Sequence, residues 1–274
     1  MTLVGQAAGQ AEAAARRSGV QIRELREIAE FELVVALYDG IWKAEPGNEP
    51  ASVELMVALS HSGNYVSGAF DGTRLVGATV GFLAGPPGTA LHSHVTGSVT
   101  GRGIGFALKL HQRAWALAQG LTQISWTYDP LVRRNAYFNI TKLGARPEKY
   151  LRSFYGRMGD VINAGDESDR LLAVWRLAEP HVVAACSSEA EPPVLPGGTV
   201  VALDTEADLP VAGRVDGRVL LVRTPKDVET LRRTDPAAAK AWRHAVREAL
   251  GGLMDGGARV TGFTADGYYI VERP

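Results

Sequence analysis

Residues 90–120 hold the feature that most constrains the fold: a strand, a glycine-rich loop and a long amphipathic helix follow one another directly. The strand is predicted over 90–99, and the loop over 100–105 has glycine at every second position. Glycine lets the backbone turn sharply and lets a ligand approach closely. The helix then runs to Gly120, and its first N–H groups point, unpaired, back into the loop. This arrangement predicts a binding site for a phosphate or pyrophosphate.

The charge distribution around this stretch also favours an anionic ligand. Residues 72–128, 57 in number, contain no Asp or Glu, although the whole chain has 30. The helical spacing places Lys109, Gln112 and Arg113 on the side opposite a broad apolar face. A zone with cations and no acids suits an anion, although a buried hairpin and helix would avoid acids as well.

Two families share this strand–loop–helix outline, and one is the dinucleotide-binding fold. Its G-x-G-x-x-G pattern needs a third glycine where this chain has Phe106 or Leu108. Asp129 follows the next strand, where an acid could bind a ribose. A long hairpin directly before the loop does not fit a fold built only from crossovers.

The other family is the GNAT superfamily of acyl-CoA N-acyltransferases, which this chain resembles more closely. Its core signature is a strand of the type V-x-P-x-x, then [QR]-x-x-G-x-[GA], then a helix, and residues 95–99 and 100–105 align with it. The order of elements is similar too: helices, an antiparallel hairpin, the signature, a strand and a short helix that ends in Leu-Gly. The resemblance, over roughly 22–177, is to an uncharacterised bacterial branch of predicted acetyltransferases.

The resemblance implies a mixed α/β (α+β) fold with a mostly antiparallel, twisted sheet and flanking helices. Local signals place elements that fit it, including a hairpin turn at Asp71-Gly72 and a helix cap at Ser52. The predicted helices are 22–42, 52–60, 104–119 and 134–143, and the predicted strands of this part are 64–70, 74–83, 90–99, 123–128 and 171–177.

The resemblance also implies acetyl-CoA, or another acyl-CoA, as the cofactor. The loop amides would bind the pyrophosphate, and the strand backbone near Val95 would pair with the pantetheine arm. Thr100 stands where the family has Gln or Arg, and Arg102 could compensate. Asn135 is either a CoA contact or a helix cap. The residues implied in cofactor binding are Val95, Thr96, Thr100, Gly101, Arg102, Gly103, Ile104, Gly105 and Asn135.

The predicted catalytic residues are His92, His94 and Tyr137. The two histidines are two positions apart on a strand and so share a face, which in the implied fold looks toward the acyl group; one of them is predicted to be the general base. The family's general-acid tyrosine aligns with Ile140, which cannot protonate a thiolate. Tyr137, one helical turn earlier, is the replacement candidate, with packing as the alternative role. No metal site is predicted.

A polar, glycine-rich stretch within 150–176 is the predicted acceptor site, and the alternative is a loop of local caps. The residues predicted to contact the acceptor are Trp126, Asp129, Tyr155, Asp160, Asn163, Asp169 and Arg170.

The chain is predicted to divide into a flexible N-terminal arm (1–21), a GNAT acyltransferase domain (22–178), a linker (179–198) and a degenerate GNAT-like C-terminal subdomain (199–274). The last part carries an amphipathic helix from Pro236 whose apolar stripe needs a partner. We therefore expect this part to extend the sheet, to dock on the first domain or to form a homodimer.

The composition excludes several classes of protein. A net charge of −1 argues against nucleic acid as a partner, and the single cysteine, Cys186, excludes a disulfide framework. The apolar runs are too short to predict a membrane span, and the N-terminus lacks the features of a signal peptide. We therefore expect a cytoplasmic protein without a membrane partner.

The favoured function is an acyl-CoA-dependent N-acyltransferase, most simply an acetyltransferase, that transfers to a primary amine of a small molecule by direct attack. The first alternative is a CoA-binding module with weak catalysis, used in sensing or assembly, which Thr100 and Ile140 support. A dinucleotide-binding enzyme is the third hypothesis.

Overall fold

The computed structural model describes residues 2–43, 47–156, 166–187 and 193–274, which belong to two compact units. The first unit comprises Met1–Trp126 and Arg176–Cys186, and the second comprises Thr127–Trp175 and Ser187–Pro274. This division does not follow the predicted linker, because the residues after 126 pack with the C-terminal part of the chain.

The first unit is built on a mostly antiparallel sheet with the strand order β1-β2-β3-β4-β5. The strands β1 to β4 pair antiparallel with their neighbours, and β4 pairs parallel with β5, which begins in this unit. The strands are β1 (Gln21–Glu24), β2 (Tyr65–Asp71), β3 (Arg74–Ala84), β4 (Ala90–Ser98) and β5 (Gln123–Tyr128).

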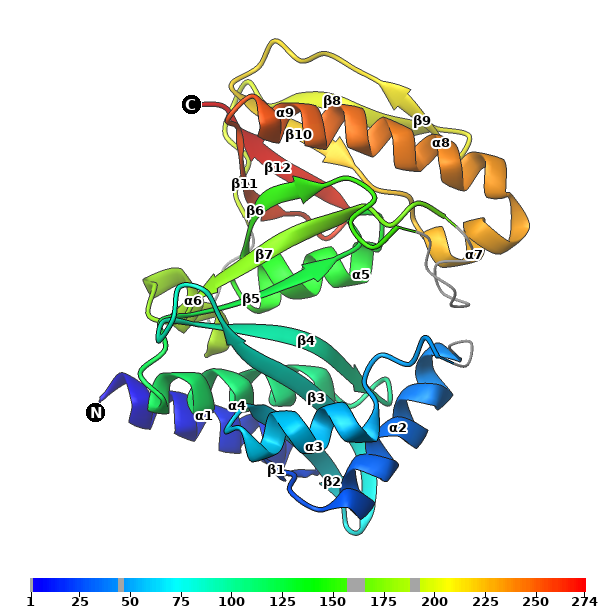
Figure 1. Cartoon of the computed structure of the whole chain (residues 1–274). Coiled ribbons are helices and arrows are strands. Elements are labelled where there is room, and N and C mark those ends of the chain that lie inside the picture. Colours follow the sequence, from blue (N-terminus) through cyan, green and yellow to red (C-terminus); the bar gives the residue numbers. More distant parts are fainter. Residues whose placement is uncertain (1, 44–46, 157–165, 188–192) are drawn as a thin grey trace. The chain divides into compact units, whose positions relative to one another are not determined.

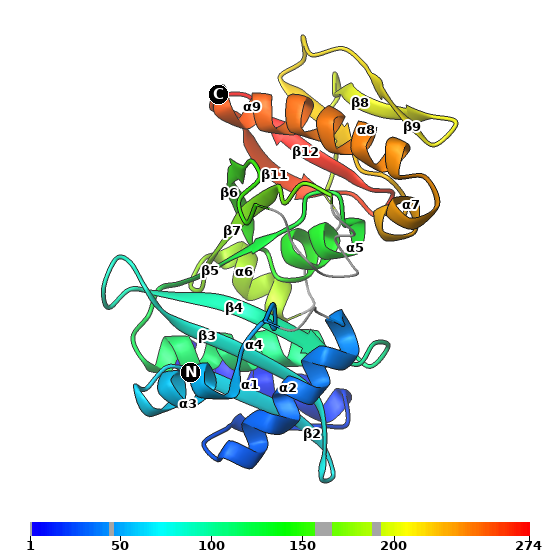
Figure 2. The same ribbon diagram turned by 45° about the vertical axis from the view of Figure 1, so that its right-hand side comes forward.

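Helices cover both faces of this sheet, with α1 and α4 on one face and α2 and α3 on the other (Figures 1 and 2). On the α4 face, Ile104 and Leu108 pack against Ala69 and Val76. On the other face, a larger apolar cluster joins α2 and α3 to β2 and β3. The helices are α1 (Leu3–Arg17), α2 (Ile28–Trp42), α3 (Val53–His61), α4 (Ile104–Ala118) and α6 (Pro180–Cys186).

Three N-terminal and linker elements differ from the sequence-based expectation. The predicted arm contains α1, whose Ala7, Ala11 and Ala14 are buried, because small side chains let this helix lie close to α4. The helix expected from residue 22 begins only at Ile28, after β1 has paired with β2. The predicted linker contains α6, whose Val182, Ala185 and Cys186 are buried.

The polar side of α4 is also buried, which the helical pattern did not predict. Lys109, Gln112 and Arg113 are all at most 5% exposed. Lys109 and Gln112 lie against the sheet, while Arg113 donates to the Leu177 carbonyl and to Gln10 of α1. The sheet and α1 therefore pack on two sides of α4. The pattern of apolar residues within one helix predicts only the side that faces the sheet core, and it does not indicate that a second element buries the polar side.

The second unit contains an antiparallel pair and a separate five-stranded sheet. The pair is β6 (Arg146–Leu151) with β7 (Arg170–Arg176), preceded by α5 (Arg133–Ala136) and the π-helical turn η1 (Tyr137–Lys142). The sheet has the order β11-β12-β10-β8-β9, with β10 parallel to β8. Its strands are β8 (Val200–Glu206), β9 (Leu209–Ala212), β10 (Val219–Arg223), β11 (Arg259–Phe263) and β12 (Tyr268–Glu272).

Three helical segments accompany this sheet. They are α7 (Val228–Thr234), α8 (Pro236–Val246) and a final turn made of η2 (Arg247–Gly251) and α9 (Gly252–Asp255) (Figure 1). The Asp235 carboxylate accepts from the Ala238 N–H and caps α8, as its position before Pro236 predicts. Trp242 of α8 is buried, and its Nε1 donates to the Asp208 carbonyl at 2.8 Å.

The C-terminal segment forms its own sheet and packs on residues 127–175. The Tyr269 hydroxyl donates to the Pro130 carbonyl at 2.9 Å, and the Thr141 hydroxyl donates to the Phe263 carbonyl at 3.0 Å. Its partner is thus the part of the predicted acyltransferase domain that follows β5. The expected fold class, a mixed α/β fold with a largely antiparallel sheet and flanking helices, is confirmed. In the described part of the chain, no helix has the length and apolarity needed to span a bilayer.

A buried ionic cluster holds the second unit together. Arg243 is 0% exposed. It donates to both carboxylate oxygens of Asp129 at 2.9 Å and also to Asp166. Arg232 donates to Asp129 at 2.5 Å and to Asp166 at 3.0 Å. Burial by itself would raise the pKa of Asp129, but the Arg243 guanidinium outweighs it and holds that pKa below its usual range.

Asp169 forms the second half of this cluster. Its carboxylate accepts from Arg247 at 2.6 and 2.8 Å, from the Tyr150 hydroxyl at 2.8 Å and from the Ser153 N–H at 2.9 Å. Burial opposes ionisation here too, but these hydrogen bonds lower the pKa of Asp169. The paired carboxylates and guanidiniums therefore stay charged inside the unit.

Removing one cation from the cluster should destabilise the second unit strongly. We expect Arg243→Met to lower the free energy of unfolding by about 3–5 kcal/mol, because Asp129 stays buried without its bidentate partner. The matched control is Arg134→Met, which breaks the exposed Arg134–Glu229 pair at 2.8 Å and should cost at most about 1 kcal/mol. Urea denaturation followed by circular dichroism measures both, and equal losses would contradict the role of the cluster.

Acid should weaken the same cluster. The pKa values of Asp129 and Asp169 are lower in the folded than in the unfolded chain. Their stabilisation is therefore complete above the unfolded pKa of about 4 and is lost as the pH falls through the folded values. Urea denaturation from pH 7 to pH 3 should show this decline, and it should be shallower in Arg243→Met, where the pKa of Asp129 is no longer held down as far. Equal declines in the wild type and in Arg243→Met would contradict the proposed contribution of Asp129 to the pH dependence of stability.

Candidate functional site

The glycine loop and the start of α4 form the predicted anion site, and their backbone geometry suits it. Gly101 and Gly103 have φ values of 91° and 74°, in the left-handed region that favours glycine. Gly103 is the N-cap of α4, so Ile104 and Gly105 are its first helical residues. Their N–H groups have no acceptor within the helix, and residues 100–103 are exposed. The helix dipole adds partial positive charge at this point.

Arg102, predicted to compensate for Thr100 at a pyrophosphate, has partners inside the first unit. Its NH1 donates to Asp71 at 2.6 Å, and its NH2 donates to the Ser18 and Gly19 carbonyls at 3.0 and 3.1 Å. Arg102 therefore ties the loop to the β2–β3 turn and to the end of α1, and most of its positive charge is balanced by Asp71.

The strands β4 and β5 separate soon after they begin to pair. Their parallel register covers three positions, from Ala90 opposite Gln123 to His92 opposite Ser125. Beyond these, residues 93–98 of β4 continue to pair with β3, while within the described residues they have no register with β5. An edge of β4 that extends from Ser93 toward the glycine loop is thus left without a neighbouring strand.

A β-bulge interrupts β4 at the start of this free edge. The register passes from Val95 opposite Val80 directly to Ser93 opposite Gly81, so that His94 is the extra residue. The His92 and His94 rings lie 5.1 and 5.9 Å from the Phe82 ring. The two histidines therefore share a side of the strand, as their spacing predicted.

The two histidines have different environments. His94 is exposed, and its Nε2 lies 2.9 Å from the Pro50 carbonyl. A carbonyl only accepts, so Nε2 carries the proton and Nδ1 of the neutral ring is free to accept one. Burial, together with the charges of His94 and Lys109, lowers the pKa of His92 to about 4. Among the described residues, no three His, Cys, Asp or Glu side chains are grouped as a metal site.

A buried lysine lies on the opposite side of β4, where the strands part. The Lys109 ammonium donates to Ser93 Oγ at 2.8 Å and to Gln112 Oε1 at 3.3 Å, and it sits 4.0 Å from the centroid of the Trp126 ring. Burial lowers the pKa of Lys109 to about 7. Ser93 and Trp126 follow the last paired residues of β4 and β5, so that Lys109 contacts both strands just where they separate.

The loop and the two histidines were predicted from the sequence as site residues, whereas Lys109 and Gln112 were predicted only as polar residues of the helix, without a role beside β4. Ser93 and the carbonyl of Pro50 were not predicted as part of the site. One feature of the sequence could have indicated a buried lysine: Lys109 stands between Leu108 and Leu110, in a stretch that contains no Asp or Glu. Trp126, predicted to contact the acceptor, packs on Lys109. The hydroxyl of Thr96, a predicted cofactor contact, is hydrogen-bonded to the Thr79 hydroxyl at 2.7 Å.

The other predicted site residues belong to the second unit. Asn135 is exposed and Tyr137 half-buried, with the Lys142 ammonium 5.8 Å from the Tyr137 ring centroid. Tyr155 is exposed, and its hydroxyl is 2.9 Å from that of Thr127. The residues whose charges are taken up by the buried ionic cluster are Asp129, Asp169 and Arg170. Asp160 and Asn163 lie outside the described residues.

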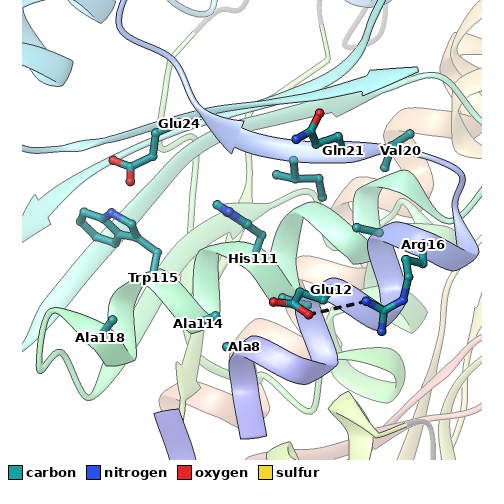
Figure 3. Close-up of a pocket in the computed structure, with 13 residues that line it drawn as sticks. Ala8, Glu12, Arg16, Val20, Gln21, Glu24, His111, Ala114, Trp115 and Ala118 are labelled. Atoms are coloured by element: carbon teal, nitrogen blue, oxygen red, sulfur yellow. Dashed lines mark ion pairs between the residues drawn. The ribbon is translucent and has the colours of Figure 1, made fainter. Parts of the chain in front are cut away.

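A separate pocket of about 530 Å³ lies between α1, β1 and α4. Figure 3 shows His111, Trp115 and Glu24 around it, with the Glu12–Arg16 ion pair, at 3.5 Å, on α1. The His111 Nδ1 is hydrogen-bonded to the buried Tyr65 hydroxyl at 2.7 Å, and burial lowers the pKa of His111. None of the residues predicted for the cofactor or for catalysis lines this pocket.

No protein-family model matches the chain, and no curated protein matches it in sequence. Solved structures do resemble it. An aminoglycoside 6'-acetyltransferase type Ii shares 16% identity over 58% of this chain and 98% of its own, with a TM-score of 0.47. The ribosomal-protein-S18-alanine N-acetyltransferase from Escherichia coli shares 11% over 58% of this chain and 95% of its own, with a TM-score of 0.46. An aminoglycoside 6'-N-acetyltransferase complexed with coenzyme A shares 16% over 58% and 98%, with a TM-score of 0.44. All three of these structures are acetyltransferases.

Proposed function

We propose that this protein binds an acyl-CoA and transfers the acyl group to a primary amine of a small molecule. The observation that carries the proposal is the free edge of β4, residues 93–98, which runs from the bulge at His94 to the glycine loop. An extended, amide-containing ligand can pair with such an edge as an added strand. A diphosphate at one end of that ligand would meet the first N–H groups of α4.

These two features fit the two ends of one cofactor. The pantetheine arm carries amide groups that can pair with the β4 edge, and the diphosphate follows it. The N–H groups of Ile104 and Gly105 would bind the diphosphate, since Arg102 is engaged by Asp71. A cofactor bound in this direction has its thioester at the bulge, beside His94.

The chemistry that we propose is direct attack by the amine. A backbone N–H group at the bulge would donate to the thioester oxygen as negative charge develops on it. The amine nitrogen forms a bond to the acyl carbon, the C–S bond breaks, and the electron pair leaves with the CoA sulfur. His94 Nδ1 accepts the proton that the amine loses, because the Pro50 carbonyl holds the ring by its Nε2–H.

CoA binding without turnover is the second candidate function. Ile140, which occupies the position of the family's general acid, is 3% exposed and so serves as a core residue. Incubation of the protein with acetyl-CoA and a panel of small primary amines separates the two functions. Release of free CoA that depends on the amine supports acyl transfer. Binding of acetyl-CoA without release of free CoA supports a CoA-binding protein without turnover.

The role of the loop can be tested at Gly105. A Cβ at this position would have 3.7 Å to its nearest neighbour, Ser98 Oγ, so a side chain can be added without a clash. We expect Gly105→Glu to weaken CoA binding by ~2 kcal/mol or more, because a carboxylate repels the diphosphate and displaces it from the amides. Gly105→Ala is the matched control and should bind nearly as tightly as the wild type. Calorimetry with free CoA measures both, and unchanged affinity in folded Gly105→Glu would rule out this loop as the cofactor site.

The assignment of the base can be tested by comparing the two histidines. We expect His94→Gln to lower kcat by roughly 100-fold while CoA affinity stays the same, because only proton acceptance is lost. His92→Gln should lower kcat much less, since its low pKa, about 4, makes His92 a poor base. Steady-state kinetics with the best amine of the panel decide between them. A larger loss in His92→Gln would transfer the role to His92.

A further inference from the structure

Lys109, the cation that lies where β4 and β5 separate, has no role in the mechanism proposed above. Lys109 is 5% exposed and lies in the first unit, where it contacts both β4 and β5. Residues 72–128 supply no carboxylate, and none of the described residues forms an ion pair with Lys109. A buried ammonium that has only neutral partners is costly, and Lys109 lowers this cost by releasing its proton near pH 7. Such a group in a binding region points to function, because an anionic partner would restore its charge.

The path of the cofactor determines what reaches this lysine. A diphosphate at the start of α4 places the pantetheine arm along residues 98 to 94 of β4, in that order. The thioester then lies at the bulge, and the acyl chain continues toward Ser93 and the last paired residues, His92 and Ser125. Lys109 donates to Ser93, so the far end of a short acyl chain is the part of the ligand that comes nearest to the ammonium.

We propose that the acyl group of the cofactor carries a terminal carboxylate, as in the CoA thioester of a short dicarboxylic acid, and that Lys109 binds this carboxylate. This inference rests on the proposed function, because it needs the acyl-CoA to lie along β4. The ligand supplies the anion that the protein does not, and Trp126 forms the flat wall beside it.

The arrangement around Lys109 fits this assignment better than it fits an acetyl group. A methyl group would face a buried cation and the Ser93 hydroxyl, to which it offers no hydrogen bond. A carboxylate accepts charge-assisted hydrogen bonds from both groups. Gln112 Oε1, at 3.3 Å, accepts from the ammonium and fixes its direction without neutralising its charge. The carboxylate stays on the transferred group and takes no part in bond making.

The test compares cofactors that differ in charge at the end of the acyl chain. Calorimetry on the full-length protein would use succinyl-CoA, butyryl-CoA of similar length without the charge, acetyl-CoA and free CoA. We expect succinyl-CoA to bind at least about 10-fold more tightly than butyryl-CoA, because the latter leaves a buried cation unpaired. The same order should hold for kcat/KM with an amine acceptor.

The variant Lys109→Met isolates the cation and keeps the side chain's length. An apolar replacement for a buried charge is tolerated well, and thermal unfolding verifies the fold. We expect Lys109→Met to lose the preference for succinyl-CoA over butyryl-CoA while free CoA binds as before. Lys149→Met, which removes an exposed lysine, is the matched control and should keep the preference.

The outcomes separate this inference from the proposed function. Tight binding of free CoA combined with equal affinity for succinyl-CoA and butyryl-CoA in the wild type would overturn the carboxylate site alone. A preference that survives in Lys109→Met would overturn the role of Lys109. Failure to bind any CoA compound would overturn the proposed function itself.

Discussion

The function proposed here depends on one constraint: β4 pairs with β3 along nearly its whole length but with β5 over three positions only. A strand bonded on both edges has no free backbone groups to offer, whereas a strand held on one edge is both rigid and able to pair. The bulge at His94 lies where the second edge becomes free, and α4, capped by Gly103, begins just beyond the other end of the strand. The scaffold, the free edge and the helix N-terminus are therefore consecutive parts of one segment.

Local sequence predicted this segment well and predicted the long-range packing poorly. The loop, the start of α4 and the bounds of β5 follow from glycine spacing, helical periodicity and β-branched residues, all of which act within a few positions. The burial of Lys109 does not, because it depends on α1 and the sheet covering α4 on two sides. Asp129 was predicted to contact the acceptor. Its actual partner, Arg243, lies 114 positions away, and no local pattern indicates such a pairing.

Three of the buried cations among the described residues, Arg243, Arg113 and Lys109, have different partners, and these differences indicate their roles. Arg243 has carboxylates on two sides, so its charge is neutralised within the fold and it stabilises the second unit. Arg113 is bound by the Leu177 carbonyl and by Gln10, and it joins α4 to the chain segments that cover it. Lys109 has a hydroxyl, an amide oxygen and an aromatic face, which orient an ammonium but leave its charge unbalanced. Arg113 also has only neutral partners, but Lys109 is the one that lies where β4 and β5 separate, so its surroundings suit an external anion.

The engagement of Arg102 by Asp71 affects the way in which the loop can recognise phosphate. With its charge largely balanced, the guanidinium adds little to the long-range field, and recognition falls to short, directional hydrogen bonds from the backbone of α4. Fields from exposed side-chain charges are screened within about 10 Å at 0.1 M salt, whereas hydrogen bonds made in contact are affected much less. A diphosphate held in this way is selected by shape at close range, so both the rate of its capture and the strength of its retention should depend only weakly on ionic strength.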